Sequence, residues 1–171
     1  LTAGAAAEIL VQYNFEGSNL AASAWHECVT APNFAYTGEG ATSFWAGYPD
    51  NTGSALRGGM WSSNDTLGAY FSFSVAPQTG FIFKATSVTL AEQRSATGPQ
   101  NWVIRYSTNG TTFYNVDEGS NGSYDTWHVQ TADGTLPLDV PQPLHIRIYG
   151  TNASDTSDSK WRVDDVTLNG T

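Results

Sequence analysis

The sequence predicts an all-β fold, an antiparallel β-sandwich of jelly-roll type. Three observations support this: apolar and polar residues alternate in several short segments, no segment has the 3.6-residue period of a helix, and turn residues separate the segments. The 171 residues suffice for one domain with a full sandwich core. We expect this domain at residues 8–171, after a short separate segment at residues 1–7.

The first expected strand covers residues 9–15, where every second residue is apolar, and Gly17-Ser18-Asn19 ends it. The next stretch, residues 20–59, loses this alternation. It combines many Gly, Pro, Asp and Asn residues with six aromatic ones. Long loops of this composition are usually functional or cover the core, so we expect residues 20–59 to form one long loop.

Alternation resumes in the middle of the chain, at residues 69–75, and Pro77 is expected to end that strand. Residues 81–90 and 102–107 also have strand patterns. Asn109-Gly110 then lies between two β-prone arms and predicts a tight hairpin, because both residues tolerate the positive φ angles of a two-residue turn.

Three more strands are expected near the end of the chain, at residues 127–131, 144–149 and 160–168. Trp102 and Trp161 alternate with other apolar residues in their strands, which favours the core for both. With about eight short strands and turns between them, an antiparallel sandwich is the expected architecture, and helices should be scarce.

The composition limits the partners of the protein. Seven basic and sixteen acidic residues give a formal charge of −9, which excludes nucleic acid and anionic membranes as expected partners. No segment is apolar over the length needed to cross a bilayer, so no membrane insertion is expected. The single Cys28 rules out an internal disulfide.

Residues 1–7 are small and apolar and end in Ala5-Ala6-Ala7, like the end of a secretory signal peptide with its cleavage point. An exposed linker or a cloning remnant explains them equally well, and an extended arm is a further reading. Asn-x-Ser/Thr triplets, which favour a secreted protein, begin at Asn64, Asn109, Asn121, Asn152 and Asn169. We expect a secreted, extracellular or cell-surface protein.

The sequence contains none of the common catalytic motifs of hydrolases, zinc proteases or nucleotide-binding enzymes. Glu92 near Arg94 is the best candidate for a catalytic acid, and a solvated ion pair is the favoured interpretation. His26-Glu27-Cys28 could suggest a metal cluster, but no second Cys or His lies nearby in the sequence, and His128 and His145 are isolated. A transition-metal site needs three or four convergent ligands, so ordinary packed or exposed histidines are the favoured interpretation. No enzymatic function is expected.

Aromatic residues in Gly-, Ser-, Asn- and Asp-rich surroundings suggest a carbohydrate-binding surface, since flat rings stack on sugars and polar neighbours bond hydroxyl groups. Arg57 adds a guanidinium group that can bind vicinal hydroxyls or the carboxylate or sulfate of an acidic sugar, although an internal salt bridge is equally consistent. Arg105 is a secondary candidate for a groove on a sheet face. The predicted sugar-contacting residues are Trp45, Tyr48, Asp50, Asn51, Arg57, Trp61, Gln93, Arg94, Tyr124 and Trp127.

Each end of the chain places a carboxylate beside an apolar strand pattern, Glu16 near the start and Asp164 near the end. An unpaired charge is costly to bury, and strands at the two ends of an all-β domain are often neighbours. Glu16 and Asp164 are therefore expected to share one cation, and their hard oxygen ligands suit calcium.

The two ends also resemble a known family. Asn14-Phe15-Glu16-Gly17 with Trp25, and the closing Val163-Asp164-Asp165-Val166-Thr167-Leu168, are similar to the first and last strands of jelly-roll carbohydrate-binding modules attached to xylanases and glucanases. In that family the motif glutamate and the first closing aspartate lie near a structural calcium, which implies the same role for Glu16 and Asp164. The resemblance implies a non-catalytic module whose partner is a polysaccharide or glycan.

A second resemblance is to small exported bacterial surface proteins with an anchor-sorting tail, which share the opening and closing motifs. It implies a structural or adhesive protein of the cell surface, biofilm matrix or an extracellular filament, assembling through sheet edges and the arm at residues 1–7. Exposure of Trp45, Tyr48 and Trp61 on one face would favour sugar binding, and burial of all three with an extended N-terminal arm would favour assembly.

Overall fold

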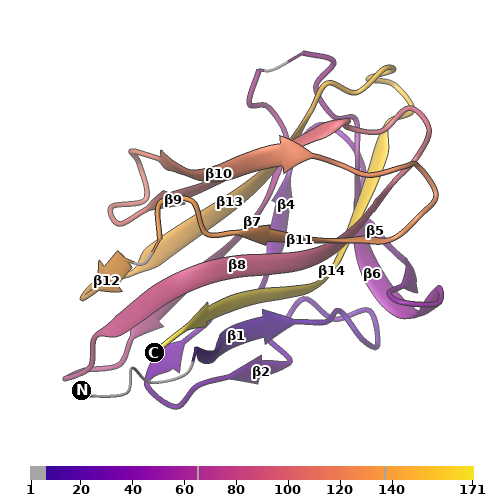
Figure 1. Cartoon of the computed structure of the whole chain (residues 1–171). Helices are drawn as coiled ribbons and strands as arrows, with labels where there is room; N and C mark the ends of the chain where they lie inside the picture. The colour runs from indigo at the N-terminus through magenta and orange to yellow at the C-terminus, as the bar shows by residue number, and fades with distance from the viewer. Residues whose placement is uncertain (1–6, 65, 137) are drawn as a thin grey trace.

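The computed structural model describes residues 7–64, 66–136 and 138–171. In this part of the chain all regular structure is strand, and two antiparallel sheets lie against each other as a sandwich (Figure 1). The same part contains no helix long and apolar enough to cross a membrane. The predicted all-β, jelly-roll-type sandwich is confirmed.

The larger sheet has eight strands, in the order β11-β8-β14-β1-β2, with β12 paired to β8, β6 paired to β14 and β5 paired to β6. Their bounds are β1 Glu8–Tyr13, β2 Ala24–Trp25, β5 Ser43–Gly47, β6 Thr52–Gly59, β8 Phe83–Arg94, β11 His128–Ala132, β12 Leu138–Val140 and β14 Lys160–Gly170. The first and last strands are neighbours, with Tyr13 opposite Val166, as their patterns predicted.

The smaller sheet has six strands, in the order β10-β9-β13-β7-β3, with β4 also paired to β7. Their bounds are β3 Val29–Thr30, β4 Ala35–Thr37, β7 Tyr70–Pro77, β9 Asn101–Ser107, β10 Tyr114–Ser120 and β13 Leu144–Thr151. In Figure 1, β10, β9, β13 and β7 lie above β8 of the larger sheet.

The core lies between the sheets and is rich in aromatic rings. Trp61 is fully buried: its ring centroid lies 5.1 Å from those of both Trp161 and Phe71, and its indole N–H donates to the carbonyl of Gly58 at 2.9 Å. A ring with no exposed surface cannot stack on a sugar. The prediction that Trp61 contacts a ligand is wrong, whereas the core positions of Trp102 and Trp161 are confirmed.

Residues 20–59 differ from the single long loop that was predicted, because five short strands, β2 to β6, lie within them. Four of the five have two to five residues, too few for an alternating pattern to be visible in the sequence. Their pairing comes from long-range neighbours such as β1, β7 and β14, which the local sequence does not reveal.

The predicted hairpin at Asn109-Gly110 joins β9 and β10, but its connection covers residues 108–113 and is not a two-residue turn. Side chains organise this longer loop. The hydroxyl of Ser107 accepts from the N–H of Gly110 at 2.9 Å, and the Asn109 side-chain oxygen accepts from the N–H groups of Thr111 and Thr112. These bonds replace the backbone pairing that a tight turn would have made.

Strand β8 runs four residues beyond its predicted end and carries Glu92 into the core. One carboxylate oxygen accepts from the indole N–H of Trp161 at 3.0 Å, and the other accepts from the Gln130 amide and the N–H of Gly122, both at 3.2 Å. Three donors compensate for the lost hydration. The predicted solvated ion pair with Arg94 is therefore wrong.

Candidate functional site

The outer face of the six-stranded sheet carries polar and aromatic side chains in three rows across β7, β13 and β9. Each row consists of residues directly opposite one another: Tyr70 with Tyr149 and Val103; Ser72 with Arg147 and Arg105; and Ser74 with His145 and Ser107. They alternate with apolar residues of the core, namely Phe71, Phe73, Ile104, Ile146 and Ile148. Side chains of a strand point alternately to its two faces, so the three rows face away from the core.

Arg147 is held between two aromatic rings at the centre of this face. Its guanidinium carbon lies 4.3 Å from the ring centroid of Tyr70 and 3.9 Å from that of Phe113. The same guanidinium donates a long hydrogen bond of 3.4 Å to the hydroxyl of Tyr149, whose ring lies 5.2 Å from that of Tyr70. A guanidinium fixed by stacking keeps most of its five donors for a ligand.

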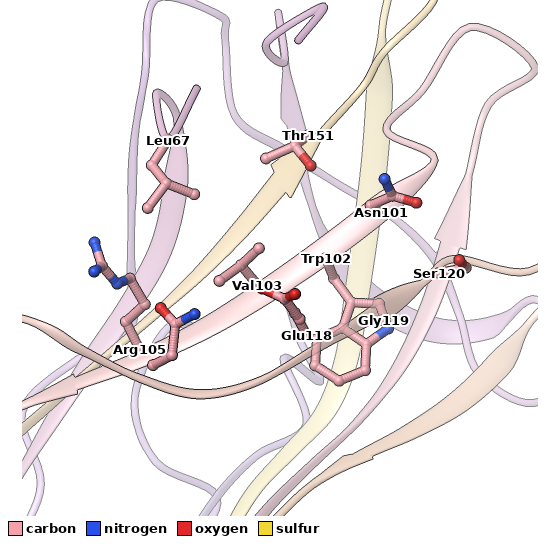
Figure 2. A pocket seen from close by; sticks show the side chains of 10 residues that line it. Leu67, Asn101, Trp102, Val103, Arg105, Glu118, Gly119, Ser120 and Thr151 are labelled. Carbon is pink, nitrogen blue, oxygen red and sulfur yellow. The ribbon is translucent and has the colours of Figure 1, made fainter. Parts of the chain in front are cut away.

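Two hollows lie side by side along this face. The larger, of about 680 Å³, is lined by residues of β9 and β10 together with Leu67 and Thr151. Figure 2 shows Arg105 and Asn101 toward opposite ends of this hollow, with Val103 between them. The smaller, of about 230 Å³, is lined by residues of β4, β7 and β13, including Tyr70 and Arg147.

Positive charge is concentrated where the hollows meet, because Arg105 and Arg147 are directly opposite each other on β9 and β13. Like charges at opposing positions destabilise a sheet unless another group compensates. In the described residues no carboxylate lies within 4.0 Å of either guanidinium. Among the described residues no group bonds the Nε atom of Arg105, which is itself buried, while the Arg105 side chain lines the larger hollow.

Most of this face was not predicted as a site. Arg105 was a secondary candidate, and Tyr70, Arg147 and Tyr149 were not singled out. The signal was present in the sequence, since these residues occupy the outward positions of two segments whose alternation was recognised, 69–75 and 144–149. To identify this face from the sequence, one would have to know that β7, β13 and β9 are neighbours. Their order depends on pairing between strands that are far apart in the sequence.

Most of the predicted sugar-contacting residues lie instead on or beside the eight-stranded sheet. Tyr48 and Trp127 form an edge-to-face pair with centroids 6.0 Å apart, and the indole N–H of Trp127 donates to the side-chain oxygen of Asn51 at 3.2 Å. Trp45 is 47% exposed and Tyr48 is half-buried. Exposure of Trp45, Tyr48 and Trp61 was expected to distinguish sugar binding from assembly. Because Trp45 is exposed, Tyr48 is half-buried and Trp61 is buried, their exposure favours neither role.

The remaining predicted residues divide between strands and loops. Arg57 is on β6, and Gln93 and Arg94 are at the end of β8. Asp50 is exposed in the turn between β5 and β6, and Tyr124 is 56% exposed in the connection before β11. Their role in binding stays a prediction.

The structure brings Glu16 and Asp164 to the same hairpin, β5–β6. A side-chain oxygen of Asp164 accepts from the N–H of Tyr48 at 2.9 Å, and one of Glu16 accepts from the N–H of Ser54 at 3.3 Å. Within the described residues no three His, Cys, Asp or Glu side chains are arranged to hold a metal. Two carboxylates fit calcium provided that backbone carbonyls, which are common calcium ligands, complete the set.

Burial is the main cause that raises the pKa of Asp164 to about 7, and the negative charges of Asp165 and Glu16 raise it further. In EDTA, the folded protein should therefore keep a proton that the unfolded chain releases at about pH 3.9. The contribution of Asp164 to the free energy of unfolding is therefore fully present below pH 3.9. It falls as the pH rises above 3.9 and is lost once the pH has passed through 7. We expect a Tm about 4 °C lower at pH 8 than at pH 5.

Thermal unfolding in EDTA across this pH range tests the prediction, with Asp164→Asn as the comparison. The variant carries no titrating group at this position, so its Tm should change less with pH. Parallel Tm curves for the two proteins would show that Asp164 does not control the pH dependence.

Comparison with known proteins identifies the fold. No protein-family model and no curated protein matches the sequence. Among solved structures, the chain is similar to the CBM22-1 xylan-binding domain of Paenibacillus barcinonensis Xyn10C, with a TM-score of 0.59, 13% identity, and coverage of 98% of this chain and 97% of that one. It is also similar to the CBM22-1–GH10 modules of Clostridium thermocellum xylanase 10B complexed with xylohexaose, with a TM-score of 0.58, 12% identity, and coverage of 95% and 28%.

A CBM4 structure is similar as well, with a TM-score of 0.52, 14% identity, and coverage of 81% of this chain and 87% of that one. Identities this low show a shared fold and do not transfer a ligand. The resemblance seen at the two ends of the sequence is thereby confirmed for the fold: the chain has the β-sandwich fold of carbohydrate-binding modules.

Proposed function

We propose that the protein is a secreted, non-catalytic carbohydrate-binding module that binds a polysaccharide along the outer face of the six-stranded sheet. The observation that carries the proposal is the pair of adjoining hollows lined by Tyr70, Arg147 and Arg105. Its fold, shared with carbohydrate-binding modules, supports the same function. Secretion is supported by the small, apolar composition of residues 1–7, of which 1–6 lie outside the described residues.

The chemistry of the face suits a chain of sugars. The ring of Tyr70 offers an apolar surface to the C–H face of a pyranose, and Arg105 and Arg147 offer donors to its hydroxyl groups. The hollows adjoin across neighbouring strands, so one oligosaccharide can cross β9, β13 and β7 while keeping contact with the sheet. Sites of this kind need little rearrangement, because rigid strands carry the side chains.

The lining of the two hollows supports a binding role without catalysis. Among their described lining residues, Glu118 is the one carboxylate. Glycoside hydrolysis by the usual mechanisms needs two carboxyl groups, about 5 to 9.5 Å apart. A module with this face is therefore expected to hold its polysaccharide unchanged.

Affinity electrophoresis through gels containing xylan, mixed-linkage β-glucan or mannan tests this function. At least one of these polysaccharides should retard the protein, and none should release reducing sugar on long incubation. Unchanged mobility in all three gels, with the fold intact, would count against the proposal, and steady release of reducing sugar would contradict the non-catalytic part.

We also propose that Glu16 and Asp164 hold a structural calcium ion together with backbone carbonyls. Both carboxylates contact the β5–β6 hairpin, so an ion here would tie this hairpin to the last strand. Ligands that bind only the folded state stabilise it by mass action, by about 2.7 kcal/mol at a concentration of 100 Kd.

Differential scanning calorimetry in EDTA and in excess calcium tests this ion. Calcium should raise the Tm by several degrees, Glu16→Gln should remove most of the increase, and Glu39→Gln, at an exposed glutamate elsewhere, should keep it. A Tm that does not respond to calcium would refute the site.

The alternative role, assembly through sheet edges and an N-terminal arm, has no specific observation in its favour in the described residues. Most of the arm falls in residues 1–6, outside that part of the chain. We therefore propose carbohydrate binding alone.

A further inference from the structure

Four of the seven lysines and arginines of the chain gather on β6, at the end of β8 and at the start of β14 in the eight-stranded sheet. Arg57, Arg94, Lys160 and Arg162 line one small hollow, together with Gln93, Ser95 and Asp125. The protein as a whole has a formal charge of −9, so a local excess of positive charge is unexpected from its composition. This hollow is on the sheet opposite the one proposed to bind polysaccharide.

Arg57 and Arg162 form the centre of the cluster. They are directly opposite each other on β6 and β14, and Gln93 of β8 lies opposite Arg162 on its other side. Both guanidinium groups contact the ring of Trp45, with their carbons 4.5 and 5.1 Å from its centroid. The sheet therefore holds two like charges side by side, an arrangement that destabilises strand pairing.

The two arginines are also partly removed from water. Burial lowers the pKa of both, and the charge of Arg57 lowers the pKa of Arg162 further. Desolvation is the largest cause for both groups and acts against the charged form, and it outweighs the opposing attraction of Asp158 for Arg57 and of Asp125 for Arg162. Contact with the Trp45 ring offsets part of this cost.

In the described residues Asp125 and Asp158 lie near enough to act on these charges, but no carboxylate forms an ion pair with Arg57 or Arg162. The two ion pairs among the described residues are Lys160 with Asp158 and His26 with Glu8, and neither includes an arginine. The guanidinium of Arg57 donates to the hydroxyl of Ser43 at 3.0 Å, whereas the guanidinium of Arg162 makes no hydrogen bond in this part of the chain. Most of the donors of the two guanidinium groups are therefore unused.

We propose that Arg57 and Arg162 bind the oxyanion of an acidic sugar, a uronate carboxylate or a sulfate ester. Planar guanidinium groups bind such oxyanions through paired hydrogen bonds. The hollow is about 40 Å³, room for an anionic group and too little for a sugar ring, so the ring would lie outside it. There the exposed part of Trp45 offers an apolar surface to the sugar ring.

The assignment of the ligand as a sugar rests on the proposed function, whereas its assignment as an anion rests on the arginine pair alone.

Titration calorimetry at low salt tests both assignments, using trigalacturonate, a sulfated galactan oligosaccharide, neutral xylohexaose and inorganic sulfate. At least one acidic oligosaccharide should bind, more tightly than inorganic sulfate, and weaken in 300 mM NaCl. Uronate binding alone would identify a carboxylate, and binding of the sulfated sugar alone would identify a sulfate.

Arg162→Gln and Arg57→Gln should each weaken binding of the acidic sugar by about 10-fold or more, as expected for loss of a charge-assisted hydrogen bond. Lys84→Gln, the same charge change at an exposed residue of β8, should leave it unchanged. Both arginine variants should keep the Tm of the unliganded protein or raise it, because each removes a repulsion. Tyr70→Ala should also leave acidic-sugar binding intact, which separates this site from the polysaccharide face.

Three results would overturn the proposal: no binding of either acidic oligosaccharide, equal losses in the Arg162→Gln and Lys84→Gln proteins, or a lower Tm in both arginine variants without ligand. Inorganic sulfate binding as tightly as the sulfated sugar would overturn the assignment to a sugar. The six-stranded sheet could fail to bind any of the tested polysaccharides while Arg162→Gln still abolishes binding of the acidic sugar. That result would support the acidic-sugar site and reject the polysaccharide face.

Discussion

Replacing Trp61 with alanine is expected to destabilise the protein by about 3–5 kcal/mol. The ring is fully buried and packs on Trp161, Phe71 and Tyr36, with centroids 5.1, 5.1 and 5.5 Å away. The substitution leaves a large cavity among aromatic rings, and it also leaves the carbonyl of Gly58 without its indole donor. A loss of this size is a large share of the stability of a typical domain.

Urea unfolding followed by circular dichroism measures this loss, with Trp45→Ala as the matched control. Trp45 is 47% exposed, so its removal should cost about 1 kcal/mol or less, chiefly through lost contact with the arginines. Equal free energies of unfolding for the two variants would show that the Trp61 ring is not a core residue. A stable Trp61→Ala protein with weakened sugar binding would restore the role predicted from the sequence.

Tyr70→Ala and Arg147→Gln are each expected to weaken polysaccharide binding by about 10-fold or more, corresponding to about 1.4 kcal/mol. Tyr70 supplies both an apolar surface and one of the two rings that hold Arg147. Its removal therefore takes away a stacking surface and leaves Arg147 free to adopt other rotamers. Arg147→Gln keeps the ring and removes the charged donors.

Affinity for the retarding polysaccharide, measured by gel retardation at several polysaccharide concentrations, checks this prediction. Tyr124→Ala is the matched control, because Tyr124 is an exposed tyrosine that the sequence predicted as a sugar contact. If Tyr124→Ala weakens binding and Tyr70→Ala does not, the site lies in the connection before β11 and not on the six-stranded sheet. Tm values for all three variants must match the parent protein for the comparison to hold.

The fold was largely predictable because alternation is a local property. Segments such as 69–75, 102–107 and 144–149 have a polar face and an apolar face, and this pattern alone indicates a strand at the surface of a core. The short strands between residues 20 and 59 were not predictable in the same way. They have too few residues to show a period, and their partners are far away in the sequence.

The candidate polysaccharide site was mostly not predictable. Its residues come from β7, β9, β13 and neighbouring loops, and their proximity depends on the strand order of the sheet. Trp61 illustrates the opposite difficulty: its Gly- and Ser-rich surroundings suggested a surface loop, whereas the glycines allow close packing. An added Cβ at Gly58 or Gly150 would lie 2.9 Å from the Trp61 ring.

The Glu16 and Asp164 pair shows what sequence motifs can supply when they lie at the chain ends. Both ends of an antiparallel sandwich can occupy one sheet, and here β1 and β14 are paired. The carboxylates therefore reach the same hairpin although 148 positions separate Glu16 from Asp164 in the numbering.

The most direct test of the central claim is an amide ¹⁵N–¹H titration of the assigned protein with xylohexaose, cellohexaose and mannohexaose in turn. A binding oligosaccharide should shift the amides of β7, β9 and β13 and the side-chain signals of Arg105 and Arg147, with β5, β6 and β14 little changed. Shifts confined to β5, β6 and β14, or no shifts with any of the three, would contradict the claim that the six-stranded sheet binds polysaccharide.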